Sequence, residues 1–76
     1  MVLKVYSVFD TKANCFNAPF FVSNDNLAKR NFVTLRDDPL STVNKFPDDF
    51  QLFDLGSYDD LTGLIVSNSV PIRLEV

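Results

Sequence analysis

The stretch from Phe50 to Val66, FQLFDLGSYDDLTGLIV, constrains the fold more than any other part of the chain. Two runs of β-forming residues flank the segment YDDLTG at 58–63. An Asp side chain can open a turn by hydrogen-bonding its own backbone, and Gly63 can adopt the positive φ that closes a type I turn with a bulge. The pattern therefore predicts a β-hairpin.

A second, less regular hairpin is predicted near the amino terminus, where FDTKAN at 9–14 separates two apolar runs. Asn14 stands where Gly63 stands in the other hairpin, and Asn tolerates positive φ better than most residues. The run 3–9 is apolar on both faces, which is typical of a central strand or one covered on both sides. The returning run, Phe16–Val22, contains Pro19 and is expected at a sheet edge or bent, because proline cannot donate a ladder hydrogen bond.

A helix is predicted between the hairpins, over residues 25–37. Asn24 or Asp25 can accept hydrogen bonds from the free amides of its first turn, and Pro39 disfavours helical geometry in the residue before it. Four residues at helical spacing form its apolar face: Leu27, Ala28, Phe32 and Leu35.

The remaining segments complete an α+β fold. In the irregular stretch 38–49, Ser41 can cap a short helical turn that carries Val43 and Phe46. After the second hairpin, the polar break at 67–69 precedes 70–76, whose alternation predicts a half-buried strand. The chain is expected to form a single domain, 1–76, with a small antiparallel sheet from two β-hairpins, one helix between them (ββαββ) and a candidate fifth C-terminal strand.

Composition argues against several classes of protein. A single cysteine, Cys15, excludes an internal disulfide framework and favours the cytoplasm. Without histidine, one chain cannot assemble a zinc site or a Cys–His nucleophile. The pair Asp59 and Asp60 fits turn chemistry better than a cation site, and two glycines supply no phosphate-binding loop. We expect no catalytic residues, no metal, no cofactor, no signal peptide and no membrane segment, and hence a protein that is not an enzyme.

The net charge of −3 is distributed unevenly. Residues 1–36 hold five Lys and Arg against two Asp, a balance of +3, whereas residues 37–76 hold two against eight acidic residues, a balance of −6. Proteins that bind single strands combine a basic track with aromatic faces on which bases stack. The nucleic-acid interpretation selects five residues of the first half as binding candidates: Lys4, Tyr6, Lys12, Lys29 and Arg30. The alternative is that Tyr6 is a core or interface aromatic and the lysines are merely solvated.

An ordered set of motifs adds a family resemblance. VLKVYSVFDTKA, APFF, ND before the helix, DP after it and PDDFQLFDLGSYDDLTGLI follow one another from Val2 to about Val66. Together they resemble the small nonstructural proteins of gokushovirus-type microviruses, phages with single-stranded circular DNA genomes. Segments after Val66 do not take part in the resemblance. The resemblance implies a DNA-binding-type protein that acts at the replication stage, and it assigns no particular binding residues.

We therefore expect a phage protein associated with single-stranded DNA during genome replication, acting as a homo-oligomer in the host bacterial cytoplasm. The alternative is a non-enzymatic module that docks on a phage or host replication protein, favoured by the net acidity and by the excess of aromatic residues. A minor structural protein of the particle is the third option.

Overall fold

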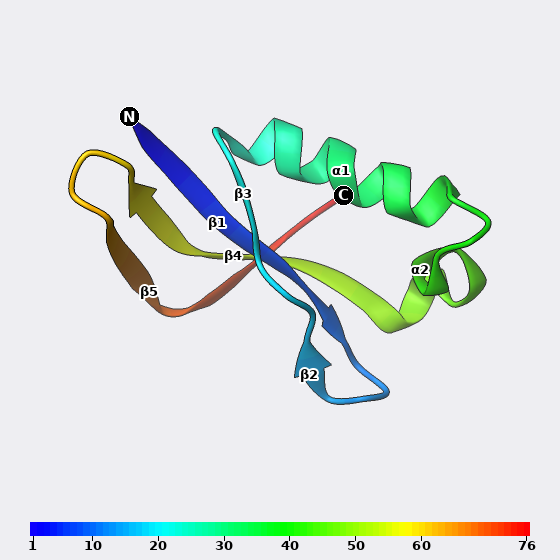
Figure 1. Cartoon of the computed structure of the whole chain (residues 1–76). Coiled ribbons are helices and arrows are strands. Elements are labelled where there is room, and N and C mark those ends of the chain that lie inside the picture. The colour runs from blue at the N-terminus through cyan, green and yellow to red at the C-terminus, as the bar shows by residue number, and fades with distance from the viewer.

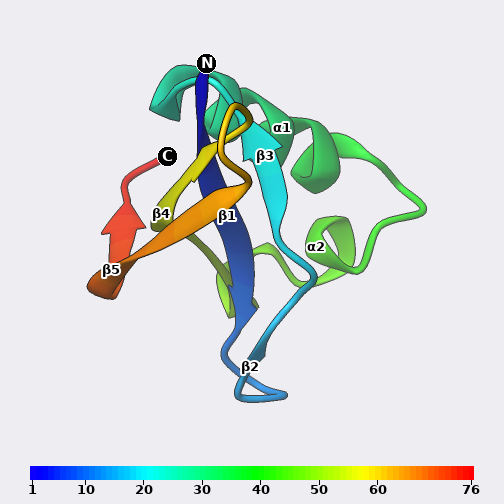
Figure 2. The same ribbon diagram turned by 60° about the vertical axis from the view of Figure 1, so that its left-hand side comes forward.

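The computed structural model describes all residues, 1–76, and has an α+β fold. The strands are β1 (Val2–Asp10), β2 (Cys15–Phe16), β3 (Phe20–Val22), β4 (Phe50–Asp59) and β5 (Leu64–Leu74). Between β3 and β4 come α1 (Asp25–Asp37), the short helix α2 (Thr42–Lys45) and the 3-10 turn η1 (Pro47–Asp49). Figures 1 and 2 show α1 and α2 on the same side of the sheet.

The sheet is antiparallel, with β1 at its centre. β1 pairs with β2 and β3 along one side and with β4 along the other, and β4 then pairs with the edge strand β5. The prediction of a central strand with apolar residues on both faces is thus confirmed. The returning strand breaks at residues 17–19, around Pro19, and so forms β2 and β3 at the edge instead of one strand.

Both predicted turns adopt the expected backbone geometry. Asn14 has φ +58° and Gly63 has φ +74°, and each donates its backbone N–H to the residue four positions earlier, Asp10 or Asp59, at 2.8 Å. Thr11, at the tip of the first hairpin, donates its backbone N–H and its hydroxyl to the carbonyl oxygen of Asp49 at 2.9 Å. The first hairpin is therefore attached to the turn η1 that precedes β4.

The helices also begin where the sequence predicts. The side chain of Asn24 accepts from the N–H of Leu27 and caps α1, whose bounds match the expected 25–37. Ser41 accepts from Val43 and caps α2.

The core lies between α1 and the sheet. Its buried members come from both hairpins and both helices: Tyr6, Val8, Ala28, Phe32, Val43 and Leu52. The side of the sheet toward α1 is called the helix face below, and the opposite side is called the open face. No helix packs on the open face (Figure 2).

The C-terminal part differs in detail from the expectation. Instead of a polar break and a separate last strand, β5 runs on from Leu64 to Leu74, with a jump in its register against β4 between Ser67 and Ile72. In 70–76 only Leu74 is half-buried, and it packs against the core. At the irregularity Gly56 has φ +152° and lies so close to β5 that an added Cβ would be 2.1 Å from the carbonyl oxygen of Val66.

Candidate nucleic-acid interface

Three phenylalanine rings cluster at one end of the open face. Phe9 and Phe16 are directly paired across β1 and β2, and their ring centroids are 4.8 Å apart. Phe53 of β4 meets both edge-on, at 6.0 Å from Phe9 and 5.4 Å from Phe16. Such tilted and edge-to-face geometries are the favourable ones for aromatic pairs. Phe16 remains 41% exposed, so the cluster presents a ring to solvent.

A second aromatic pair lies toward the other end of the same face. Phe21 is directly opposite Val5, and Tyr58 is directly opposite Leu3, so all four residues share the open face. The rings of Phe21 and Tyr58 are 5.6 Å apart across β1 and leave Val5 buried beneath them. Phe21 is 43% exposed. The open face therefore carries five aromatic rings in two groups, which we call the aromatic face: Phe9, Phe16, Phe21, Phe53 and Tyr58.

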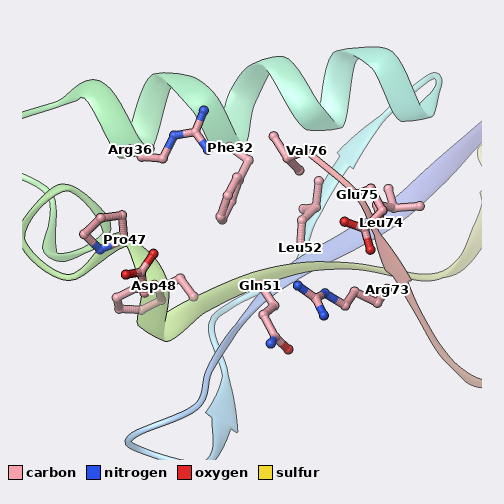
Figure 3. A pocket seen from close by; sticks show the side chains of 11 residues that line it. Phe32, Arg36, Pro47, Asp48, Gln51, Leu52, Arg73, Leu74, Glu75 and Val76 are labelled. Atoms are coloured by element: carbon pink, nitrogen blue, oxygen red, sulfur yellow. The ribbon is translucent and has the colours of Figure 1, made fainter.

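The charge on the open face differs from that of the whole chain. The open-face residues of β4 and β5 include Gln51, the direct partner of Phe9, and Arg73, the direct partner of Phe53. Figure 3 shows the side chains of Arg73 and Gln51 on the side of β4 away from Phe32 and Leu52. Arg73 has no carboxylate within ion-pair distance, since the ion pairs of the chain are Met1–Asp60 and Lys4–Asp54. None of the open-face positions of the paired strands holds an acidic residue: Leu3, Val5, Ser7, Phe9, Phe16, Phe21, Gln51, Phe53, Tyr58, Ile65, Ser67 and Arg73.

Tyr6 is placed differently from the expectation. Its side chain is fully buried on the helix face, stacked against Phe20 at 5.8 Å, and its hydroxyl donates to the carboxylate of Asp25. A ring without exposed surface cannot stack on a base, so the expectation for Tyr6 is corrected. The alternative that Tyr6 is a core aromatic describes it correctly.

Lys4 shares the helix face with Tyr6 and takes part in a polar network. Its ammonium donates to Oδ2 of Asp54 at 2.7 Å. Oδ1 of the same buried carboxylate accepts from the backbone N–H of Gly56 and from the side-chain amide of Asn68, both at 3.1 Å. Asn68 donates as well to the backbone carbonyl of Asp54 at 3.0 Å. The network joins β1, β4 and β5 at the irregularity, so Lys4 has a structural partner.

The other predicted residues do not join Lys4 in one surface. Lys12 is in the first hairpin turn, beside a shallow cavity shared with Phe46 and Asp49. Lys4 lies near the opposite end of β1, beside residues 23–26, which lead into α1. Six residues of strand separate Lys4 from the start of that turn, a distance of about 20 Å. Lys29 and Arg30 lie on α1, on the helix side of the sheet.

A cavity of 260 Å³ opens between α1, η1, β4 and the last residues of the chain, and its lining includes Gln51 and Arg73 of the open face as well as residues of the helix face. Figure 3 shows Phe32 pointing toward it from α1, Asp48 from η1 and Val76 from the C-terminal segment, while the side chain of Arg36 lies along α1. It mixes both signs of charge, with Arg36 and Arg73 against Asp48 and Glu75. Elsewhere, no three His, Cys, Asp or Glu side chains gather in an arrangement that would hold a metal ion.

Comparison with known protein families gives one match. The model of the family described as Phage ORF5 protein matches residues 3–75, nearly the whole chain. The chain belongs to this family. It is therefore a bacteriophage protein, which confirms the phage origin implied by the resemblance in the sequence. No curated protein and no solved structure matches it.

In this Phage ORF5 family member, the helices are too short or too polar to span a membrane.

The sequence alone predicted only one part of the aromatic face. Phe9 and Phe53 lie at alternating positions of predicted strands. The register of the predicted first hairpin would pair Phe9 with Phe16, and this is the part that the sequence indicates. The sequence did not indicate which face of β1 the helix would cover, and that choice decides which aromatics remain accessible.

Proposed function

We propose that this phage protein is a non-enzymatic protein of gokushovirus-type microviruses that binds single-stranded DNA during genome replication in the host cytoplasm. The observation that carries the proposal is the aromatic face. Bases of a single strand can stack on exposed rings, and each such stack contributes roughly 1–3 kcal/mol. The two groups of rings, at opposite ends of β1, offer separate places for bases along one strand.

The location of charge supports the same face. The chain is acidic overall, which disfavours contact with phosphates. On the open face, however, Arg73 forms no ion pair, and none of the strand positions on this face holds an acidic residue. Lys12, in the turn that joins β1 to β2 and beside Phe46 and Asp49, is a second cation that forms no ion pair.

This arrangement predicts binding dominated by stacking, with a weak dependence on salt. Two phosphate contacts would give a slope of about −1.4 in log K against log salt for a single strand. Raising the salt fourfold would then weaken binding only about sevenfold. A site built from Lys4, Lys12, Lys29 and Arg30 would instead lose affinity much more steeply.

The test is a fluorescence-anisotropy titration of labelled oligothymidine, with a duplex of the same length as the comparison. We expect Phe16→Ala and Phe21→Ala each to weaken single-strand binding about 5- to 150-fold, corresponding to the loss of one stacked base. The control is Leu40→Ala, because Leu40 is 90% exposed and lies between α1 and α2, away from the open face. Circular dichroism and thermal unfolding establish that each variant is folded.

Two results would contradict the proposal. Unchanged affinity in both the Phe16 and Phe21 variants would remove the aromatic face as the site. If Lys29→Ala combined with Arg30→Ala abolished binding instead, DNA would lie on the helix side, as the sequence alone predicts.

The exposed aromatic surface also favours a second candidate, a module that docks on a phage or host replication protein. An apolar patch on a small protein often marks a protein contact. Failure to bind any oligonucleotide at low salt, together with capture of a replication protein that Phe16→Ala abolishes, would select this function.

A further inference from the structure

The edge strand β5 differs from the other edge of the sheet. The edge made by β2 and β3 is interrupted at residues 17–19, and Pro19 has no N–H to offer a partner. In β5, the first residues, 64–67, pair in regular register with β4 on one side, while their other side has no neighbour. This short stretch is therefore an unpaired and regular template for another strand.

The side chains of this stretch are exposed and uncharged. Leu64, Ile65 and Val66 are 62–63% exposed, on both faces of the strand. Natural monomers usually protect a sheet edge with charges, proline or a bulge. Here the irregularity and Pro71 protect only the later part of β5, and no charged residue occurs between Gly63 and Ile72.

We propose that residues 64–67 of β5 pair antiparallel with β5 of a second copy of this chain, in the register that places Ile65 opposite Ile65 of the second copy. The occupant follows from the charge of the stretch. The chain carries a net charge of −3, so most of its surface would repel a copy of itself, whereas this stretch brings no charge to the contact. An identical strand in antiparallel orientation also supplies a self-complementary partner, as a two-fold symmetric interface requires.

The same features limit the assembly to a dimer of modest strength. The register jump after Ser67 stops the ladder after four residues, which leaves no long edge for further copies. Such an interface is smaller than the ~800 Å² per partner of a standard one, so we expect a dissociation constant of about micromolar or weaker. A two-fold axis perpendicular to the sheets places both aromatic faces on one side of the dimer.

Sedimentation of the DNA-free protein tests this directly, and its outcome does not depend on nucleic-acid binding. With rising protein concentration, the mass should rise from 8.6 kDa toward twice that value. Ile65→Lys should raise the dissociation constant at least about tenfold, because two like charges then meet near the axis. The matched control is Leu61→Lys, which adds the same charge to the 85%-exposed turn residue outside the strand and should leave the dimer intact.

A charge swap separates lost pairing from lost folding. An equimolar mixture of Ile65→Lys and Ile65→Glu chains should dimerise although neither variant does so alone. If either variant fails to fold, the concentration dependence of amide hydrogen exchange at residues 64–67 in the natural chain gives the same answer. Two results would overturn the proposal. The first is a natural chain that stays monomeric at millimolar concentration. The second is a dimer that Ile65→Lys does not affect, which would place the contact elsewhere, such as on the aromatic face.

Discussion

Removal of the Asp54 carboxylate should destabilise the protein far more than removal of any exposed carboxylate. In Asp54→Ala the buried N–H of Gly56 loses its acceptor, which costs about 1–3 kcal/mol. Asn68 retains its hydrogen bond to the backbone carbonyl of residue 54, so the loss of its second acceptor adds little to the free-energy cost of the substitution. Lys4 loses its partner, but its side chain is 35% exposed and can turn to water, which limits that loss to about 1 kcal/mol or less.

The expected total is about 1–4 kcal/mol, against an overall stability of roughly 4–11 kcal/mol for a chain of this length. Asp54→Asn retains an oxygen for the Gly56 N–H and loses only the charge, so it should cost about 1 kcal/mol. Urea unfolding followed by circular dichroism measures both values. The control is Asp60→Ala, whose exposed contact with the amino terminus should leave the midpoint unchanged.

Two outcomes would refute this reasoning. An Asp54→Ala protein within about 0.5 kcal/mol of the natural chain would mean that the network does not hold β5 on β4. Equal losses in Asp54→Asn and Asp54→Ala would mean that the charge of the Lys4 pair, and not the hydrogen bond to Gly56, carries the stabilisation.

Two further predictions concern the backbone and the pH dependence. Gly56→Ala should cost more stability in urea unfolding than Gly63→Ala, because both have positive φ but only at Gly56 would the new Cβ collide with β5. At Tyr6, burial raises the pKa of the hydroxyl above its usual value of 10.0, and the hydrogen bond to Asp25 raises it further. The unfolded chain therefore loses this proton first, so the stabilisation is complete below pH 10 and declines as the pH rises through the folded value. Tyr6→Phe should remove that part of the alkaline decline in stability, and a decline identical to that of the natural chain would contradict the assignment.

Local chemistry accounts for the parts of the fold that the sequence predicts well. The cap at Asn24, the proline at 39 and the residues with positive φ at 14 and 63 act within a few residues of themselves. Their effects therefore hold in almost any tertiary context. The same local signals placed Ser41 at the start of the short helix α2.

Predictions that depend on distant contacts were less successful. The spacing of Lys4 and Tyr6 correctly indicates that they share a face of β1, but alternation has no information on which face a helix will cover. The helix covers theirs, so Tyr6 enters the core and Lys4 meets a carboxylate fifty residues away. In the polar segment of β5, Asn68 likewise donates a hydrogen bond to the backbone of Asp54 in β4, a contact that no local pattern reveals.

By itself, the sequence of this phage protein determines most of its elements, its turns and the residues that share a strand face between irregularities, because these follow from backbone preferences and a period of two. Only the tertiary structure decided that Phe9, Phe16, Phe21, Phe53 and Tyr58 share one uncovered surface and that the edge of β5 lies open. The physical reason is that exposure depends on which face α1 packs against, and that packing arises from contacts between residues far apart in the chain.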